Sequence, residues 1–382
     1  MQRVLIVCTT DSMIWNFLVP HIEAMMAKGI SVECACSKTG FYFDDLKNKY
    51  QLRVFRIPFE RSPFSIKNMA ALKKLYSIMK KGHYDIVFCH EPVGGALGRV
   101  CGWMNGCYVI YMAHGFHFYK NGPIFKNHLF YISERILAKI TDVIITINTE
   151  DFIAAKRFKL RKNGRVFKID GIGVNTRRFL DKSSNRVEIK KSLGLPIDSF
   201  VVTTVSEFIP RKNISTGLKA FSKAKLPNSY YLLVGGGQLE KELKKQSKDL
   251  GIDDRTLFLP FRKDIESIYR ITDIFLFPTF QEGLALVGIE AMCSGLPLVC
   301  SNVRGVNEYA NENTGITCNP FDYKEFAAAL CKLYYNENMR KMIGENNTKL
   351  VDKFDIEHAV SSILHIFEYV QLLDMKDDFE VK

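Results

Sequence analysis

Short continuous runs of apolar residues alternate with longer segments of helical period along the whole chain. The first series opens with the apolar run 3–8, followed by a helical pattern that ends at Gly29, and the series restarts with the apolar run 200–205. Short apolar runs separated by amphipathic helical segments are typical of parallel strands that helices cover on both faces. Two such series predict two doubly wound α/β domains.

The restart of the pattern also sets the expected domain boundaries. We expect one domain over residues 1–175 and a second over 185–357, with the polar stretch 175–186 between them, and a helix at about 358–382 that packs back on the first domain. A helix is expected over 63–81, capped by Ser62 and with Pro63 at its first position. Expected strands lie at 3–8, 31–36, 85–90, 108–113, 142–147, 200–205, 230–235, 256–259, 273–278 and 297–300. Ligands of open α/β sheets bind outside the carboxyl ends of the strands, so we expect two facing sheets to share one cleft.

Composition and length agree with two globular domains. The chain has 382 residues, of which 47% are hydrophobic and 25% are charged. No apolar run reaches the roughly 18 residues that span a bilayer, and the apolar part of the N-terminal stretch is too short for a signal peptide. The ten cysteines lie mostly inside apolar runs and form no C-x-x-C pair, which indicates buried, reduced thiols in a cytosolic protein.

Charge is distributed unevenly between the two halves. Residues 1–182 contain 28 Lys and Arg against 14 Asp and Glu, a net charge of +14, whereas residues 183–382 contain 25 against 27, a net charge of −2. A basic half beside a nearly neutral half indicates that the first domain faces an anionic partner. Nucleic acid and an anionic membrane surface are both candidates.

The stretch FQEGLALVGIEAMCSGLPLVC at 280–300 places two glutamates eight positions apart. Glu282 follows an expected strand, and Glu290 lies about a turn inside an expected helix that runs to Gly295. The first turn of a helix offers unpaired N–H groups to a phosphate, and a carboxylate accepts hydrogen bonds from vicinal hydroxyls. Two hydroxylated groups on either side of a phosphate describe a nucleotide sugar. A solvated loop glutamate followed by an ordinary helix glutamate would give the same pattern.

Three further segments follow expected strand ends in the second domain. Arg211 and Lys212 could neutralise a diphosphate. The glycines at 235–237 permit a close approach of the backbone to a ligand, and Phe261 and Arg262 stand where a base could lodge. Each feature alone is common on protein surfaces, but their occurrence at successive strand ends favours the nucleotide sugar.

The order of these segments resembles the retaining GT-B glycosyltransferases of family 4, which include bacterial enzymes of capsular and exopolysaccharide synthesis. The matching segments are VSEFIPRKN, LLVGGG, LPFRKDI and DIFLFPTFQEGLALVGIEAMCSGLPLV, with the E-x7-E pair Glu282 and Glu290 as the most specific element. HEPVGGALGR at 90–99, HGFHFYK at 114–120 and IDGIGVNTRRF at 169–179 extend the resemblance over nearly the whole chain. The resemblance implies a GT-B fold of two Rossmann-like domains.

The resemblance also implies roles for the charged candidates. Glu282 would bind hydroxyls of the donor sugar, and Glu290 would bind those of the ribose. Arg211 and Lys212 would hold the diphosphate and stabilise charge on the departing nucleotide. His114, just after the expected strand 108–113, would face the donor sugar from the first domain, and together with Glu282 it is the catalytic candidate.

The remaining donor contacts that the resemblance implies involve the backbone. N–H groups around Ala285, Leu286 and Val287 would meet the sugar and the diphosphate, and the backbone near Phe261 and Arg262 would read the base. We see no D-x-D motif after a strand, so we expect no catalytic metal and no cofactor besides the nucleotide-sugar substrate. The family resemblance implies transfer with retention of anomeric configuration.

The chain departs from the family pattern at two places. Many members carry an arginine about five residues before the lysine, where this chain has Glu207, so the diphosphate contact would depend on Lys212 and Arg211. The glycine-rich first loop is absent, and Thr9, Thr10 and Asp11 stand in its place, where they could line the acceptor side.

These features together predict an enzyme that moves a hexose or related sugar from a nucleotide sugar to a lipid-linked saccharide. The capsule-type resemblance favours UDP over GDP as the carrier and a polyprenyl diphosphate as the lipid. Two alternatives differ in class: a GT-B epimerase that acts on the nucleotide sugar alone, and a nucleic-acid-binding protein with a basic first domain. The epimerase gives no reason for a basic, aromatic-rich first domain, and the chain has no nucleic-acid-binding motif, so we expect no nucleic-acid partner.

A lipid-linked acceptor predicts that the protein docks as a peripheral protein on the cytoplasmic face of the membrane. Two expected helices of the first domain combine apolar residues with basic ones, and their apolar residues could equally pack on the sheet. In the helix 63–81 these residues are Ile66, Met69, Leu72, Leu75, Tyr76, Met79, Lys67, Lys73, Lys74, Lys80 and Lys81. In the helix 123–140 they are Phe125, Leu129, Phe130, Ile132, Lys126 and Arg135.

Overall fold

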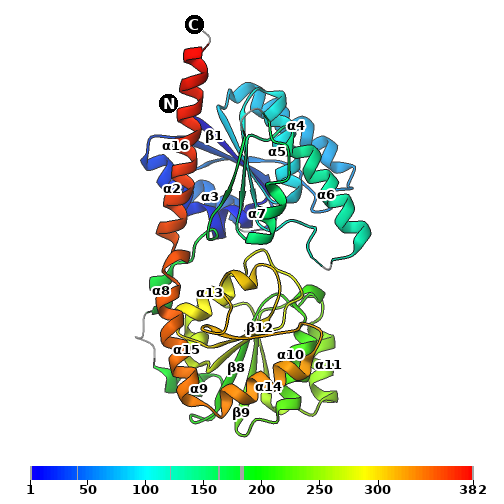
Figure 1. Ribbon diagram of the computed structural model, residues 1–382, viewed down its shortest axis with the longest axis vertical. Coiled ribbons are helices and arrows are strands. Elements are labelled where there is room, and N and C mark those ends of the chain that lie inside the picture. The colour runs from blue at the N-terminus through cyan, green and yellow to red at the C-terminus, as the bar shows by residue number, and fades with distance from the viewer. Residues whose placement is uncertain (1, 41, 121, 162–163, 181–184, 381–382) are drawn as a thin grey trace. The chain divides into compact units, whose positions relative to one another are not determined.

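The chain forms two compact α/β units, each built on one parallel sheet (Figure 1). The structure is a computed structural model and describes residues 2–40, 42–120, 122–161, 164–180 and 185–380. The N-terminal unit comprises Met1–Gly173 and Ile356–Lys382, and the C-terminal unit comprises Val174–Asp355. The polar stretch at which we expected the boundary includes residues 181–184, which lie outside the described residues, as do 381–382 of the expected last helix.

The N-terminal unit contains a seven-stranded parallel sheet in the order β3-β2-β1-β4-β5-β6-β7. Its strands are β1 (Arg3–Thr10), β2 (Ser31–Ser37), β3 (Arg53–Arg56), β4 (Ile86–His90), β5 (Tyr108–Ala113), β6 (Val143–Thr146) and β7 (Arg165–Lys168). Its helices are α1 (Asp11–Met13), α2 (Val19–Ala27), α3 (Tyr42–Tyr50), α4 (Lys67–Gly82), α5 (Pro92–Met104), α6 (Ile124–Ala138), α7 (Thr149–Ala155) and α16 (Ile356–Glu380), with a π-helical turn at Ile14–Leu18. The strand order reverses between β1 and β4, which is the point where open α/β sheets bind ligands.

The C-terminal unit repeats the plan with a six-stranded parallel sheet in the order β10-β9-β8-β11-β12-β13. Its strands are β8 (Phe200–Val205), β9 (Ser229–Val234), β10 (Thr256–Leu259), β11 (Ile274–Phe277), β12 (Leu298–Ser301) and β13 (Gly315–Cys318). Its helices are α8 (Thr176–Leu180), α9 (Arg186–Ser192), α10 (Ile214–Ala224), α11 (Glu240–Asp249), α12 (Ile265–Ile271), α13 (Leu286–Cys293), α14 (Tyr323–Tyr334) and α15 (Glu337–Leu350). Short 3-10 turns lie at Pro210–Lys212, Asp253–Arg255, Val306–Glu308 and Asp352–Phe354. Here the strand order reverses between β8 and β11.

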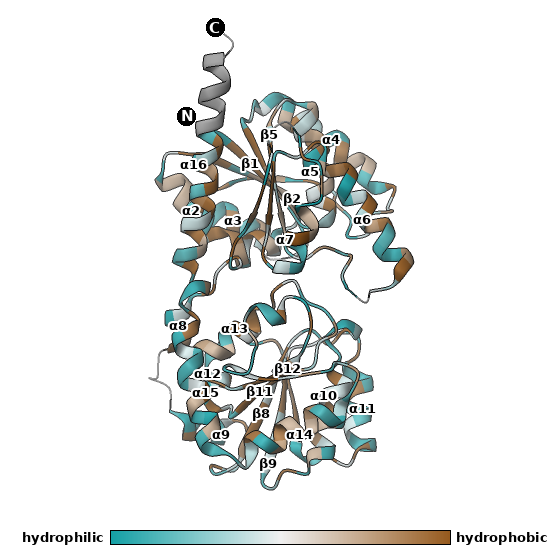
Figure 2. Ribbon diagram, viewed as in Figure 1, coloured by the Kyte–Doolittle hydropathy of each residue, from teal (hydrophilic) through white to brown (hydrophobic). Residues whose placement is uncertain are grey.

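Each unit has its own hydrophobic core against its sheet, and most of the strands are brown, for hydrophobic, in Figure 2. The inner strands of each sheet are buried along nearly their whole length because helices cover both faces, which explains why they are continuously apolar. The edge strands β3, β7 and β10 are partly exposed. All ten cysteines are free, and nine of them are buried, as their apolar surroundings in the sequence indicated. None of the helices within the described residues has both the length and the apolar character that crossing a bilayer requires.

The last helix, α16, packs on the N-terminal unit. The ring of Phe367 meets Phe88 of β4 at 5.5 Å between centroids, and the ring of Tyr369 meets Phe167 of β7 at 5.6 Å. The chain passes between the units twice, and Val174 pairs with Asp355 at these crossings, where the N–H of Val174 donates to the carbonyl of Phe354 at 2.9 Å.

The start of α4 differs from the prediction. Ser62 does not cap this helix and Pro63 does not begin it, because the helix begins at Lys67. The side chain of Asn68 instead holds the preceding segment as a turn: its Oδ1 accepts from the N–H of Glu60 at 3.0 Å, and its Nδ2 donates to the carbonyl of Ser62 at 2.9 Å. A buried asparagine that makes both bonds fixes a turn where the propensities alone favoured a helix start.

Helix α6 is attached to the N-terminal unit by a buried ion pair and two partly buried aromatic side chains. Arg99 of α5 is fully buried, donates to both carboxylate oxygens of Glu134 on α6 at 2.7 and 3.1 Å, and lies 3.8 Å from the ring centre of Tyr111. Phe130 and Tyr131 add partly buried contacts to the core. The other side of α6 is apolar but exposed, and Figure 2 shows hydrophobic residues along this helix. The exposed fractions are 89% for Ile124, 82% for Phe125, 39% for Leu129, 40% for Ile132 and 60% for Ile136.

Candidate active site

In the C-terminal unit, two segments of the candidate site follow the carboxyl ends of β8 and β11, the central strands between which the order reverses. The segment after β8 carries Arg211 and Lys212 in a 3-10 turn, and the segment after β11 carries Thr279 and Glu282. The N–H of Phe280 donates to the carbonyl of Arg211 at 2.9 Å, which ties the two segments together. Side chains about 70 positions apart in the sequence therefore converge at the ligand-binding edge of this sheet.

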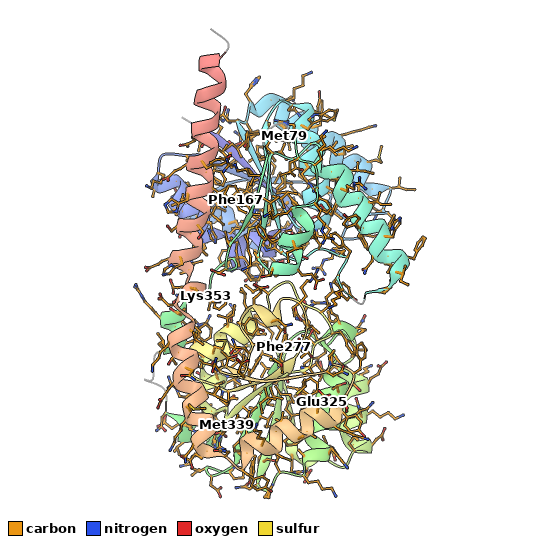
Figure 3. The ribbon with its side chains drawn as sticks, viewed as in Figure 1. Met79, Phe167, Phe277, Glu325, Met339 and Lys353 are labelled. Atoms are coloured by element: carbon orange, nitrogen blue, oxygen red, sulfur yellow. The ribbon has the colours of Figure 1, made fainter. Side chains whose placement is uncertain are left out.

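Glu282 lies at the centre of this convergence. Its side chain is 6% exposed, Oε1 accepts from Lys212 Nζ at 2.7 Å and from the Thr279 hydroxyl at 2.8 Å, and Oε2 accepts from Arg211 Nη1 at 2.8 Å. Lys212 is 12% exposed and lies 5.3 Å from the ring centre of Phe277, which Figure 3 labels. Burial lowers the pKa of Lys212, while the charge of Glu282 opposes that shift and holds the ammonium in place. A carboxylate and two cations are thus preorganised within hydrogen-bond distance.

Helix α13 begins directly after this group. Ala285 precedes the helix in a left-handed conformation with φ of 65°, and the helix runs from Leu286 to Cys293. Gly288 lets this turn pack closely, because a Cβ at that position would stand 2.3 Å from the hydroxyl of Tyr309. The N-terminal N–H groups of the helix, with their partial positive charge, are suited to a phosphate. The donor contacts expected for the backbone at Ala285, Leu286 and Val287 stay a prediction.

Glu290 lies one turn further along α13 and is held by a tyrosine. The hydroxyl of Tyr269 lies 3.2 Å from Glu290 Oε2 and 3.2 Å from the carbonyl oxygen of Val287. Burial raises the pKa of Glu290 from its usual value to about 7, against the lowering effects of Tyr269 and of the charge of Arg178. Such a carboxylate gains from a ligand that donates hydrogen bonds to its ionised form.

The glycines after β9 lie against the segment that follows β8. Gly235 and Gly237 have φ of 141° and 155°, and a Cβ at Gly235 would stand 2.0 Å from the carbonyl oxygen of Ser206. Phe261, after β10, is 75% exposed, and Arg262 donates to both carboxylate oxygens of Asp264 at 3.0 and 2.5 Å. The guanidinium of Arg262 is thus engaged by Asp264, and the base-reading role of the backbone at Phe261 and Arg262 stays a prediction.

Two further charged residues, Glu207 and Arg304, contribute to the electrostatics of this site. Glu207, which stands where the family resemblance implies an arginine, is exposed, and its negative charge acts on Lys212 in the direction that raises the pKa of the ammonium. Arg304, which follows β12, is 8% exposed, and its Nε donates to the backbone carbonyl of Glu282 at 3.2 Å. Sequence reasoning missed Arg304, Thr279 and Tyr269, since no motif singled out these three positions.

In the N-terminal unit, candidate residues lie at the carboxyl ends of β1, β4 and β5. The carboxylate of Glu91 accepts from the N–H of Thr10 at 3.0 Å, and Glu91 itself has φ of 61° and ψ of 163°, a conformation that costs energy for any residue but glycine. His114 Nε2 lies 3.0 Å from Nδ1 of His90, the last residue of β4. Asp11 is buried and accepts from Thr39. The motif HEPVGGALGR at 90–99 was part of the family resemblance, but it did not indicate that His90 pairs with His114.

Two parallel, doubly wound units with ligand-binding edges at both points of strand reversal define the GT-B class of glycosyltransferases. Residues 185–350 match the family described as glycosyl transferases group 1, and residues 3–148 match glycosyl transferase 4-like. The Bacillus subtilis (strain 168) protein EpsD is 30% identical over 98% of this chain and 99% of its own length. The chain therefore belongs to the group 1 family of glycosyltransferases, and it is an enzyme of the exopolysaccharide type.

Two further proteins complete the comparison. UDP-Gal:alpha-D-GlcNAc-diphosphoundecaprenol alpha-1,3-galactosyltransferase of Escherichia coli is 29% identical over 91% of each chain. The crystal structure of Anabaena Alr3699/HepE, in complex with UDP and glucose, superposes with a TM-score of 0.82 at 18% identity, and the match covers 97% of this chain and 100% of that one. At that identity the likeness shows the fold alone.

Proposed function

We propose that this protein is a retaining, metal-independent glycosyltransferase that moves a hexose or related sugar from a UDP-sugar to a lipid-linked saccharide during surface polysaccharide synthesis. The observation that carries the proposal is Glu282, a buried carboxylate that Lys212 and Arg211 hold at the start of α13. The name of the Escherichia coli relative specifies a UDP-linked donor and a diphosphoundecaprenol-linked acceptor, which supports the same classes of substrate here.

The proposed donor site assigns one partner to each part of the nucleotide sugar. Glu282 accepts from hydroxyls of the transferred sugar, and Glu290, one turn into α13, accepts from the ribose hydroxyls. The N–H groups at the start of α13 and the cations of Lys212 and Arg211 meet the diphosphate. The backbone at Phe261 and Arg262 reads the base, and His114 of the N-terminal unit contacts the transferred sugar.

Transfer then depends on stabilising the leaving nucleoside diphosphate. The two cations and the helix N-terminus offset the charge that builds on the departing phosphate, which is the task that a divalent metal performs in other transferases. Adding EDTA should therefore leave the transfer rate unchanged, and a clear loss that Mg²⁺ or Mn²⁺ restores would refute metal independence. Analysis of the product linkage by NMR tests retention, because inversion would give the opposite anomer.

The N-terminal unit is proposed to dock on an anionic membrane surface, where a lipid-linked acceptor resides. The support lies in the exposed apolar side of α6 together with exposed lysines on α4. Lys73, Lys74, Lys80 and Lys81 are all exposed and form no ion pair among the described residues. Apolar side chains that enter the headgroup region and lysines that meet anionic lipids are the usual combination for peripheral binding.

The deciding experiment supplies donor with and without acceptor. The purified protein is incubated with a panel of UDP-sugars and a diphosphoundecaprenol-linked GlcNAc, and products are separated by mass. Transfer to the lipid-linked sugar supports the proposal. Conversion of a nucleotide sugar into its epimer without acceptor would show the epimerase instead. A melting temperature that rises with UDP but not with short DNA separates both enzymes from a nucleic-acid binder.

A further inference from the structure

Two histidines meet at the carboxyl edge of the N-terminal sheet, on neighbouring parallel strands. His90 ends β4, and His114 follows the last residue of β5. Nδ1 of His90 lies 3.0 Å from Nε2 of His114, and the ring centroids are 5.3 Å apart with planes inclined by 29°. His90 is fully buried, whereas His114 is half-buried. The hydrogen bond therefore links an interior ring to one that a ligand can reach.

Both rings are neutral near pH 7. Burial lowers the pKa of His114 to about 4 and holds the pKa of His90 well below its usual value, and His21 nearby adds to both shifts. Two neutral imidazoles that share one N···N hydrogen bond place a single proton in it. That proton is bonded either to Nδ1 of His90 or to Nε2 of His114. In the first case Nε2 of His90 is bare and Nδ1 of His114 is protonated. In the second case Nε2 of His90 is protonated and Nδ1 of His114 is bare.

The surroundings of His90 distinguish the two arrangements. Its Nε2 is buried and has no hydrogen-bond partner within the part of the chain that the structure describes. If His114 were the donor, His90 would carry its own proton on Nε2 and bury an unpaired N–H. If His90 is the donor, its Nε2 carries a lone pair and no proton. Orphaned buried N–H groups are the rarer and costlier case, so the second arrangement is favoured.

We propose that His90 donates from Nδ1 to Nε2 of His114, so that His114 carries its proton on Nδ1 and presents a hydrogen-bond donor to its ligand. His90 is then a positioning residue that fixes the tautomer and the ring orientation of His114 without touching substrate. His114 serves as a donor to an oxygen atom, and no proton transfer is needed. That the oxygen belongs to the transferred sugar rests on the proposed function.

The tautomer can be measured without any assay of transfer. The full chain is labelled with ¹⁵N-histidine, and the ring-nitrogen chemical shifts separate protonated nitrogens from bare ones, with His90→Phe and His114→Phe used for assignment. At pH 7.5 we expect His114 to show a protonated Nδ1 and a bare Nε2. A bare Nδ1 with a protonated Nε2 in the wild-type protein would overturn the proposal, as would a doubly protonated ring.

Two variants at position 90 connect the tautomer to catalysis. His90→Phe keeps an aromatic ring beside Phe88 but removes the donor, and it should release His114 into a mixture of tautomers and lower kcat about tenfold or more. His90→Asn places an amide N–H near the position of Nδ1, and it should restore the Nδ1–H signal of His114 and much of the rate. His365→Phe, a change at an exposed histidine of α16, is the matched control and should alter neither.

These measurements separate the proposed tautomer of His114 from its proposed contact with the transferred sugar. Full activity in His114→Ala would remove its proposed contact with the transferred sugar and leave the tautomer result standing. An Nδ1–H signal of His114 that persists unchanged in folded His90→Phe would show that His90 does not set the tautomer, whatever the transfer rate.

Discussion

Lys212 and Glu282 form an ion pair at 2.7 Å, and both side chains are nearly buried. The cation proposed for the diphosphate and the carboxylate proposed for the sugar are therefore a single charged unit before any substrate binds. In the proposed donor site, the negative charge of the donor would compete with Glu282 for Lys212 and Arg211, and its sugar hydroxyls would replace the hydrogen bonds that the carboxylate gives up. We therefore propose that binding of the diphosphate and orientation of the sugar are coupled through this pair.

The first prediction concerns Glu282→Ala. Loss of one charged hydrogen bond to the sugar, at about 1.5–3 kcal/mol, should lower the transfer rate roughly 10- to 150-fold. UDP should bind as well as before or more tightly, because Lys212 and Arg211 no longer pair with a carboxylate. Initial rates and calorimetric titration with UDP measure the two effects, with Glu312→Ala, an exposed loop change, as the control. A parallel fall in rate and UDP affinity would mean that Glu282 only holds the cations in place.

The second prediction concerns the pH dependence that Glu290 imposes on nucleotide binding. Its pKa in the folded protein is about 7, so the carboxylate becomes protonated as pH falls through 7 and can then accept fewer hydrogen bonds from the ribose. UDP affinity of the wild-type protein should fall between pH 8 and pH 6 relative to that of Glu290→Gln. Dividing the UDP affinity of the wild-type protein by that of Glu290→Gln at each pH cancels the effect of titrating the UDP phosphate, because this effect is common to both proteins. A ratio that stays constant over this range would contradict the ribose assignment.

The second prediction has a further part, which concerns the effect of Glu290 on the free energy of unfolding. A carboxyl whose pKa is raised on folding binds its proton more tightly in the native state, so ionising it costs stability. That cost is absent below the unfolded pKa of about 4.5 and fully present above the folded pKa of about 7. Glu290→Gln should therefore be more stable than the wild-type protein at pH 8, by on the order of 3 kcal/mol at most. The difference should shrink toward pH 5, and urea titrations at the two pH values measure it.

The third prediction separates the diphosphate from the nucleoside. Lys212→Ala and Arg211→Ala should weaken binding of UDP far more than binding of uridine, and Lys212→Ala should have the larger effect because its ammonium is the more buried of the two cations. Calorimetric titration with both ligands measures the difference, and Lys219→Ala, a change at an exposed lysine of α10, is the control. Equal losses for UDP and uridine would indicate a damaged fold instead.

The fourth prediction tests docking on membranes. Changing Lys73, Lys74, Lys80 and Lys81 to Glu should abolish binding to anionic vesicles, since each lysine near such a surface contributes roughly 1 kcal/mol, and should spare UDP affinity. A Phe125→Ser change on α6 should weaken binding without affecting its dependence on salt. Reversal of Lys241, Lys244, Lys245 and Lys248 on α11 is the matched control, and these lysines are exposed too. Co-sedimentation at low and high salt is the measurement, and equal binding of all variants to neutral and anionic vesicles would exclude electrostatic docking.

The fold was predictable from the sequence because continuous apolar strands recur at regular intervals in both halves. Strand β10 has the predicted bounds, and α13 ends before Gly295, whose φ of 73° stops the helix as expected. The start of α4 was not predictable, because it depends on the side chain of Asn68, which bonds backward to the turn. Periodicity describes which face is apolar, but it does not describe such local competition for backbone groups.

Residue contacts were harder to predict than residue types. The charges of Lys212 and Glu282 were visible in the sequence, but their pairing depends on two strands that only the sheet order brings together. His90 and Tyr269 were missed for the same reason, since each acts through a neighbour on another element. In the expected stripe of α4, Leu75 and Met79 are buried as core residues, whereas Ile66 precedes the helix and is 87% exposed.

The buried pair of Arg99 and Glu134 has a consequence for how this protein can change over time. Charge and two aromatic contacts hold α6 in place, so the identity of its outer residues adds little to folding stability. Substitutions along that side can accumulate without a penalty to the core, provided that an acid remains at position 134. The outer side of α6, which we propose enters the membrane surface, can therefore change in sequence while the core of the N-terminal unit stays the same.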